Sequence, residues 1–247
     1  MQELERWLDE VNNASWTNSP EEGELLRPVA EHYIRQLASV PEQAMPMLLH
    51  AIETSEKDRI TTAFEVVRVI GYPQNTAAIP YLFSFLSDAN FPGGGDVIGA
   101  LREIDAEVLL PYITRILLKQ APPFSYNQNE KDWEDLVKGC CYYLRDHADQ
   151  HLVQRCLPAV NFYLSYTLVR QPEKYSGTLY LIVDIIEKMG CPEDFLPALV
   201  LLAKEQGDNK IGQHAQRLLL SFTDEQLAPY RFLLASPSAS EEDEGEK

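Results

Sequence analysis

The feature that most constrains the fold is a short proline-centred phrase that occurs six times. An apolar residue precedes each proline, and in all copies but the last, apolar residues follow two, five and six positions later. Successive prolines are separated by 34, 31, 47, 39 and 32 residues. A repeat of this length is typical of stacked helical hairpins rather than of one globular core. The six prolines are Pro46, Pro80, Pro111, Pro158, Pro197 and Pro229.

The phrase predicts the start of a helix. Its apolar positions form one stripe of a 3.6-residue period. Proline lacks an N–H and clashes with the carbonyl four residues back, so it is tolerated near a helix start, where the donors are unpaired anyway. Residues that cap helices lie upstream, such as Asp105 before Pro111 and Thr223 before Pro229. We therefore expect each phrase proline in the first or second turn of a helix and an all-α chain.

The repeat also divides the chain. We expect residues 1–39 to form N-terminal capping helices that are continuous with one domain of repeats over 40–235. Glycines at 71 and 190 are predicted to end helices, and Asp208 to cap a helix of the last hairpin. Residues 236–247 are rich in Ser and Glu and are predicted to be a disordered acidic tail.

Charge restricts the partners. The chain has 21 Lys and Arg against 38 Asp and Glu, a formal net charge of −17. A nucleic-acid surface needs a basic stripe that this composition does not supply, so a basic protein partner is favoured. We find no signal peptide and no apolar run long enough to span a membrane, and we expect a cytoplasmic monomer.

No motif predicts catalysis or a cofactor. The glycines before Asp96 resemble a phosphate cradle, but an aspartate in place of Lys-Ser/Thr would repel an anion. Cys140, His147 and His151, with Cys141 nearby, could bind zinc, yet their spacing matches no structural zinc site. Together with Cys156 and Cys191, these cysteines are predicted to be buried, reduced thiols. We expect no enzyme, no cofactor and no metal.

Large aromatic side chains in irregular segments are the best binding candidates. Phe91 lies in a glycine-rich break beside Asp96, and Phe124 and Tyr126 lie in a long insertion over 120–131, followed by Trp133. Loops often carry binding residues, and aromatic groups are costly to leave in water. The alternative is that these aromatic residues fold back and pack against the ends of the hairpins.

The phrase, its spacing and the capping residues resemble HEAT-like α-solenoids over roughly residues 40–235. The stretch Ile79–Gly93, with Leu82, Asp88, Asn90 and Phe91-Pro92-Gly93, is similar to a small bacterial HEAT-like domain family of unknown function. That resemblance implies a right-handed α-solenoid of about six to seven antiparallel hairpins, whose second helices line a concave face.

Two functions follow as hypotheses. The first is a non-enzymatic protein-binding solenoid, an adaptor or scaffold whose acidic surface binds a basic partner; an immunity-type inhibitor of a cationic toxin is one form of it. The second is a small-ligand carrier or lyase-like enzyme that uses the concave groove, as some related solenoids do. In that case Cys140, Cys141, His147 and His151 would be the first residues to examine.

Overall fold

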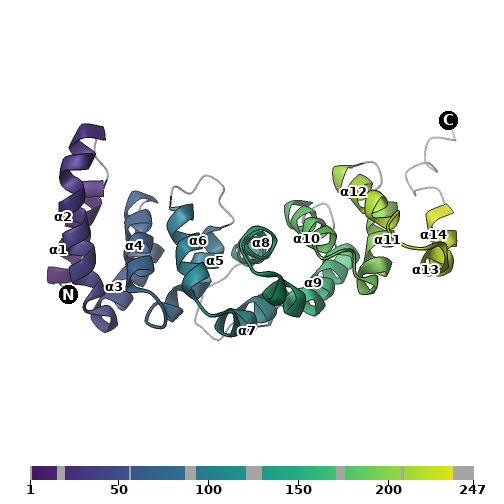
Figure 1. Cartoon of the computed structure of the whole chain (residues 1–247), viewed down its shortest axis with the longest axis horizontal. Coiled ribbons are helices and arrows are strands. Elements are labelled where there is room, and N and C mark those ends of the chain that lie inside the picture. Colours follow the sequence, from purple (N-terminus) through teal and green to yellow (C-terminus); the bar gives the residue numbers. More distant parts are fainter. Residues whose placement is uncertain are drawn as a thin grey trace. The chain divides into compact units, whose positions relative to one another are not determined.

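The computed structural model describes residues 2–15, 20–55, 57–86, 93–120, 130–170, 176–206 and 209–235. Across these ranges the regular structure is helical throughout, which confirms the predicted all-α class (Figure 1). The chain divides into two compact units, residues 1–116 with 121–143 and residues 117–120 with 144–247. We call them unit 1 and unit 2 and describe each by itself.

The helices of unit 1 pair mainly with near neighbours in the sequence. α1 packs against α2, α3 against α4, and α6 against both α4 and α5. Leu8, Leu48, Phe64 and Leu101 are among the fully buried core side chains. The helices are α1 Gln2–Ser15, α2 Pro20–Ala38, α3 Pro41–Thr54, α4 Lys57–Ile70, η1 Thr76–Ala78, α5 Ile79–Phe85, α6 Gly94–Glu103, α7 Ala106–Leu117 and α8 Glu130–Asp146, of which α7 and α8 each end in residues assigned to unit 2.

The helices of unit 2 form two rows. α10 contacts α12 in one row, and α11 contacts both α9 and α14 in the other, which we call the proline row because it carries the phrase. The rows are joined where α9 meets α10 and α11 meets α12 (Figure 1). The elements are α9 Gln150–Arg170, α10 Ser176–Lys188, η3 Glu193–Phe195, α11 Leu196–Glu205, α12 Lys210–Leu219, α13 Asp224–Leu227, η4 Ala228–Tyr230 and α14 Arg231–Ala235.

The apolar stripe of the phrase is core. The residue two positions after the proline is fully buried in the first five copies. In the sixth copy Arg231 takes this position with a side chain 68% exposed. The buried residues at this position are Leu48, Leu82, Ile113, Val160 and Leu199.

The prolines enter their helices in four ways. Pro229 lies in the 3-10 turn η4, between α13 and α14. Pro46 and Pro111 lie in the second turn of continuous helices, as predicted. Pro80 and Pro197 stand in the first turn of an α-helix that follows a 3-10 turn, which avoids the clash with the preceding carbonyl. For Pro158 the prediction is wrong. α9 begins at Gln150, so this proline lies in the third turn of a helix that continues upstream.

The predicted helix ends are largely confirmed. Gly71 and Gly190 have φ of +72° and +76° directly after α4 and near the end of α10, which is the conformation of a glycine C-cap. The Asp105 carboxylate accepts from the Glu107 N–H at 2.9 Å, and Thr223 forms a capping box with Gln226. Asp208 is not the cap of α12. It lies outside the described residues, and Asn209 accepts from the Ile211 and Gly212 N–H groups.

The cysteines are free thiols. Cys140, Cys141 and Cys156 are buried as predicted, and burial raises the pKa of Cys156 to about 12. Cys191 is instead half-buried. It follows Gly190 in the turn after α10 and has a φ of +53°, so it belongs to the turn rather than to a helix face.

One close approach fixes α8 against α5 inside unit 1. A Cβ on Gly139 would lie 1.8 Å from the carbonyl oxygen of Phe83, so only glycine allows the two backbones to come this near. Four residues further on, Tyr143 packs edge-on against the Phe83 ring and donates its hydroxyl to the Leu101 carbonyl at 3.4 Å.

Candidate functional site

The predicted binding residues have different outcomes. Phe91, Phe124 and Tyr126 lie outside the described residues. Trp133 is half-buried on α8, and its Nε1 is buried with no hydrogen-bond partner among the residues that the structure describes. Asp96 is in the first turn of α6 and accepts from Arg68 Nε of α4 at 2.8 Å. Of the five predicted binding residues, the structure therefore describes Trp133 and Asp96, and the Asp96 carboxylate is already paired with Arg68 inside unit 1.

The Arg68–Asp96 ion pair is built into the packing of unit 1. The Arg68 side chain crosses Gly99, where a Cβ would lie 2.8 Å from its Cδ. Glu65 is one turn back on α4; burial raises the pKa of its carboxyl, the charge of Asp96 adds to the rise, and Arg68 opposes it. Glu65 also lines a cavity of about 530 Å³ between α1, α2 and α4, with Glu31 at its wall. This part of unit 1 is acidic, and its Asp96 carboxylate is paired with Arg68.

The sequence-predicted metal candidates do not converge on a described site. Cys140 is buried in unit 1, whereas His147 is half-buried and His151 exposed in unit 2. Among the described residues, three potential ligands come together elsewhere: Asp184 and Glu187 of α10 and His214 of α12. One ligand atom from each lies within 4.8 Å of the others.

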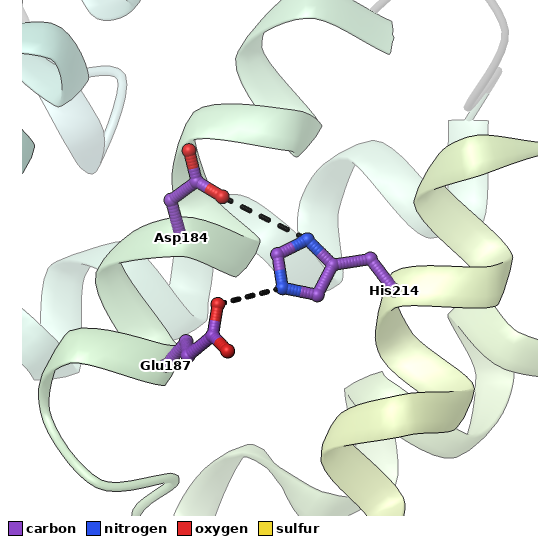
Figure 2. A group of neighbouring side chains, drawn as sticks. All are labelled: Asp184, Glu187 and His214. Carbon is purple, nitrogen blue, oxygen red and sulfur yellow. Dashed lines mark hydrogen bonds and ion pairs between the residues drawn. The ribbon is translucent and has the colours of Figure 1, made fainter.

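His214 lies between the two carboxylates (Figure 2). Its Nε2 is 2.9 Å from Glu187 Oε2 and its Nδ1 is 3.7 Å from Asp184 Oδ1, while its side chain is 9% exposed. The ring of Tyr180, one turn before Asp184, is tilted by 59° to the imidazole, and the ring centroids are 6.0 Å apart. The histidine thus joins α10 to α12 by contacts from both ring nitrogens.

Cations already neutralise these carboxylates. Arg145 contacts Asp184 Oδ2 at 3.0 Å and Asp146 at 2.6 Å, and Arg217 contacts Glu187 at 3.0 Å. Hydrogen bonding to Asp146 holds the pKa of Arg145 above its ordinary value, against the effect of burial. Asp, Glu and His suit a divalent transition metal, but a dication here would compete with two guanidinium groups. The contacts account for the group as an ion-pair network that joins neighbouring helices.

Two open grooves lie side by side in sequence order along the proline row of unit 2. The first, about 430 Å³, is lined by Leu157, Pro158 and Asn161 of α9 and by Pro192, Asp194 and Phe195 before α11. The second, about 520 Å³, is lined by Asp194 and Pro197 of the same repeat and by Glu225, Pro229 and Tyr230 of the next. Asp194 lines both grooves.

The two grooves use equivalent positions around successive proline phrases. Each lies between the start of one proline phrase and the residues that lead into the next phrase. Asn161 Nδ2 donates to the backbone carbonyl of Asp194 at 3.1 Å and so joins the two sides of the first groove. Glu193, Asp194 and Glu225 are exposed, whereas Phe195 is 1% exposed. Both grooves therefore combine proline surface with the exposed carboxylate of Asp194, and the second adds Tyr230, Glu193 and Glu225.

Two of the groove carboxylates, Glu193 and Glu225, follow a pattern that is visible in the sequence. A glutamate stands four residues before the phrase proline in four of the six copies: Glu42, Glu107, Glu193 and Glu225. Acids in the first turn of a helix are ordinarily explained by the helix dipole, so this pattern does not by itself indicate a groove. Asp184, Glu187 and His214 could not be found in this way, because their meeting depends on how α10 packs against α12.

No family model matches the chain, and no curated protein matches it. Within the described residues, no helix combines the length and apolar character needed to cross a membrane.

Proposed function

We propose that this protein is a non-enzymatic helical-repeat scaffold, built as a HEAT-like solenoid of the cytoplasm, that binds a basic segment of a partner protein. The observation that carries the proposal is the pair of successive grooves at the repeat junctions of unit 2, which share Asp194. Equivalent surfaces repeated along a row are the means by which repeat proteins bind extended partners.

The grooves suit arginine or lysine. Pro158, Pro197 and Tyr230 offer apolar and aromatic surface to the methylene part of a long basic side chain. The carboxylate of Asp194 is available to a guanidinium or ammonium group, and a hydrogen bond between two ionised partners is stronger than a neutral one. The net charge of −17 would attract a cationic partner and repel an acidic one.

The test is binding of a fluorescein-labelled peptide rich in arginine and proline to the full chain, followed by anisotropy. A peptide of the same length, with each arginine replaced by glutamate, is the control for the sign of the charge. We expect the basic peptide to bind and its affinity to fall steeply between about 0.05 M and 0.5 M salt, because screening shortens the reach of exposed charges.

A charge-matched pair of variants separates the grooves from the general acidity of the chain. Asp194→Asn with Glu225→Gln removes two groove carboxylates, and Glu21→Gln with Glu205→Gln removes two exposed carboxylates elsewhere. Exposed ion pairs contribute up to about 1 kcal/mol each, so the groove variant should bind about fivefold to tenfold more weakly. Equal affinities of the two variants would contradict the proposal.

A further inference from the structure

We infer that both grooves are occupied together by one extended segment in the polyproline II conformation, with basic side chains three residues apart. The inference rests on the proposed function and adds the conformation and spacing of the partner. It starts from Asp194, which lines both grooves and so places them in adjacent positions along the proline row.

Helix packing sets the spacing. The grooves flank the start of α11, one toward α9 and the other toward α13 and η4. Packed helices lie about 8–10 Å apart, so two side chains that enter successive grooves must be separated by about 9 Å. Both must also point to the same side of the bound segment.

A polyproline II segment meets both conditions. It has three residues per turn and rises about 3.1 Å per residue, so positions i and i+3 share a face and lie about 9.3 Å apart. A β-strand places same-face residues about 6.6 Å or 13 Å apart, and neither distance fits. Prolines at 158, 192, 197 and 229 border the grooves and give flat surfaces against which an extended segment can pack.

The test uses the full chain and three labelled peptides of identical composition. Each has two arginines in a proline-rich background, at spacing i,i+2, i,i+3 or i,i+4. We expect the i,i+3 peptide to bind about threefold to tenfold more tightly than the other two, because it alone engages both grooves.

Three variants localise the effect. Asp194→Asn should abolish the preference for i,i+3, since this carboxylate lines both grooves, and only the backbone of Asp194 bonds to Asn161. Gln154→Lys places a positive charge in the first groove alone. It should lower the affinity of the i,i+3 peptide to that of a peptide with one arginine. Glu205→Gln, on the last turn of α11, should retain the preference. Circular dichroism checks that each variant is folded.

The outcomes distinguish this inference from the proposed function. Equal affinity of the three peptides, with weaker binding by Asp194→Asn, would overturn the spacing and leave the basic-partner function standing. Failure of all three peptides to bind, or binding that Asp194→Asn leaves unchanged, would overturn both. Tighter binding by a helical peptide with arginines at i,i+7, which also lie about 10.5 Å apart, would overturn the polyproline II conformation.

Discussion

Replacement of Gly139 by alanine should destabilise unit 1, although alanine is ordinarily the better helix former. The new Cβ would lie 1.8 Å from the Phe83 carbonyl oxygen and 2.8 Å from its carbon. Non-bonded heavy atoms sit about 3.5 Å apart, so α5 and α8 would have to separate by about 1.7 Å. Such a shift would disturb the ring contact between Phe83 and Tyr143 and the hydrogen bond from Tyr143 to Leu101.

The magnitude follows from two opposing effects. Overpacking costs about 1–3 kcal/mol and the cost rises when backbone must move, whereas Gly to Ala inside a helix gains up to about 1 kcal/mol. We expect a net loss of about 2 kcal/mol, which lowers the melting temperature by about 4–8 °C in a domain of this size. Gly95→Ala is the matched control, because a Cβ there meets nothing within 4 Å. It should be neutral or slightly stabilising.

Tryptophan fluorescence is the suitable assay. Trp7, Trp16 and Trp133 are the three tryptophans of the chain, and all belong to unit 1, so thermal unfolding followed at their emission reports on that unit. Circular dichroism follows both units. Equal melting temperatures for Gly139→Ala and Gly95→Ala would refute the close approach of α5 and α8.

Three further predictions concern charge and thiols. Glu65→Gln should be as stable as the parent or more stable at neutral pH. The raised pKa of Glu65 shows that the folded state favours the protonated carboxyl. The stabilisation that Glu65 gives to the fold is therefore present below the ordinary pKa of 4.5 and is lost as pH rises through the folded pKa. Urea unfolding across this range checks whether the advantage of the glutamine disappears in acid. Alkylation followed by mass spectrometry should modify Cys191 before Cys156, because burial raises the pKa of the Cys156 thiol to about 12; early labelling of Cys156 would contradict its burial. Arg145→Ala should lower the free energy of unfolding by about 1–2 kcal/mol and Arg217→Ala by less than about 1 kcal/mol, since their side chains are 21% and 62% exposed; equal losses in urea titrations would count against the network.

Periodicity predicted the helices because it records which side of each helix is buried. The apolar stripe around each phrase proline needs only local sequence to be recognised, and the capping roles of Gly71, Asp105 and Thr223 depend on residues within a turn. The position of Pro158 in the third turn could not be predicted in the same way. Where a helix begins upstream of a proline depends on packing that compensates for the lost backbone hydrogen bond.

The candidate sites depend on contacts between helices, which a single sequence does not record. Asp184 and Glu187 look like solvated helix positions until α12 brings His214 between them. From the sequence, Asp194 is an ordinary acid at the start of a helix. Its place in two grooves depends on α9 on one side and on α13 and η4 on the other. The aromatic residues of the irregular segments are predicted to bind a partner only because large apolar side chains are costly to expose. Phe91, Phe124 and Tyr126 lie outside the described residues.

The most direct test of the proposed function locates a bound basic segment on the chain. An arginine- and proline-rich peptide with a spin label at one end would be titrated into isotopically labelled protein, and signal loss from paramagnetic relaxation would be mapped on the amide spectrum. The account predicts the strongest loss at residues 154–161, 193–197 and 225–230, and weaker loss at Asp184 and His214. Loss that is centred on α10 and α12, or spread evenly over the acidic surface, would contradict it.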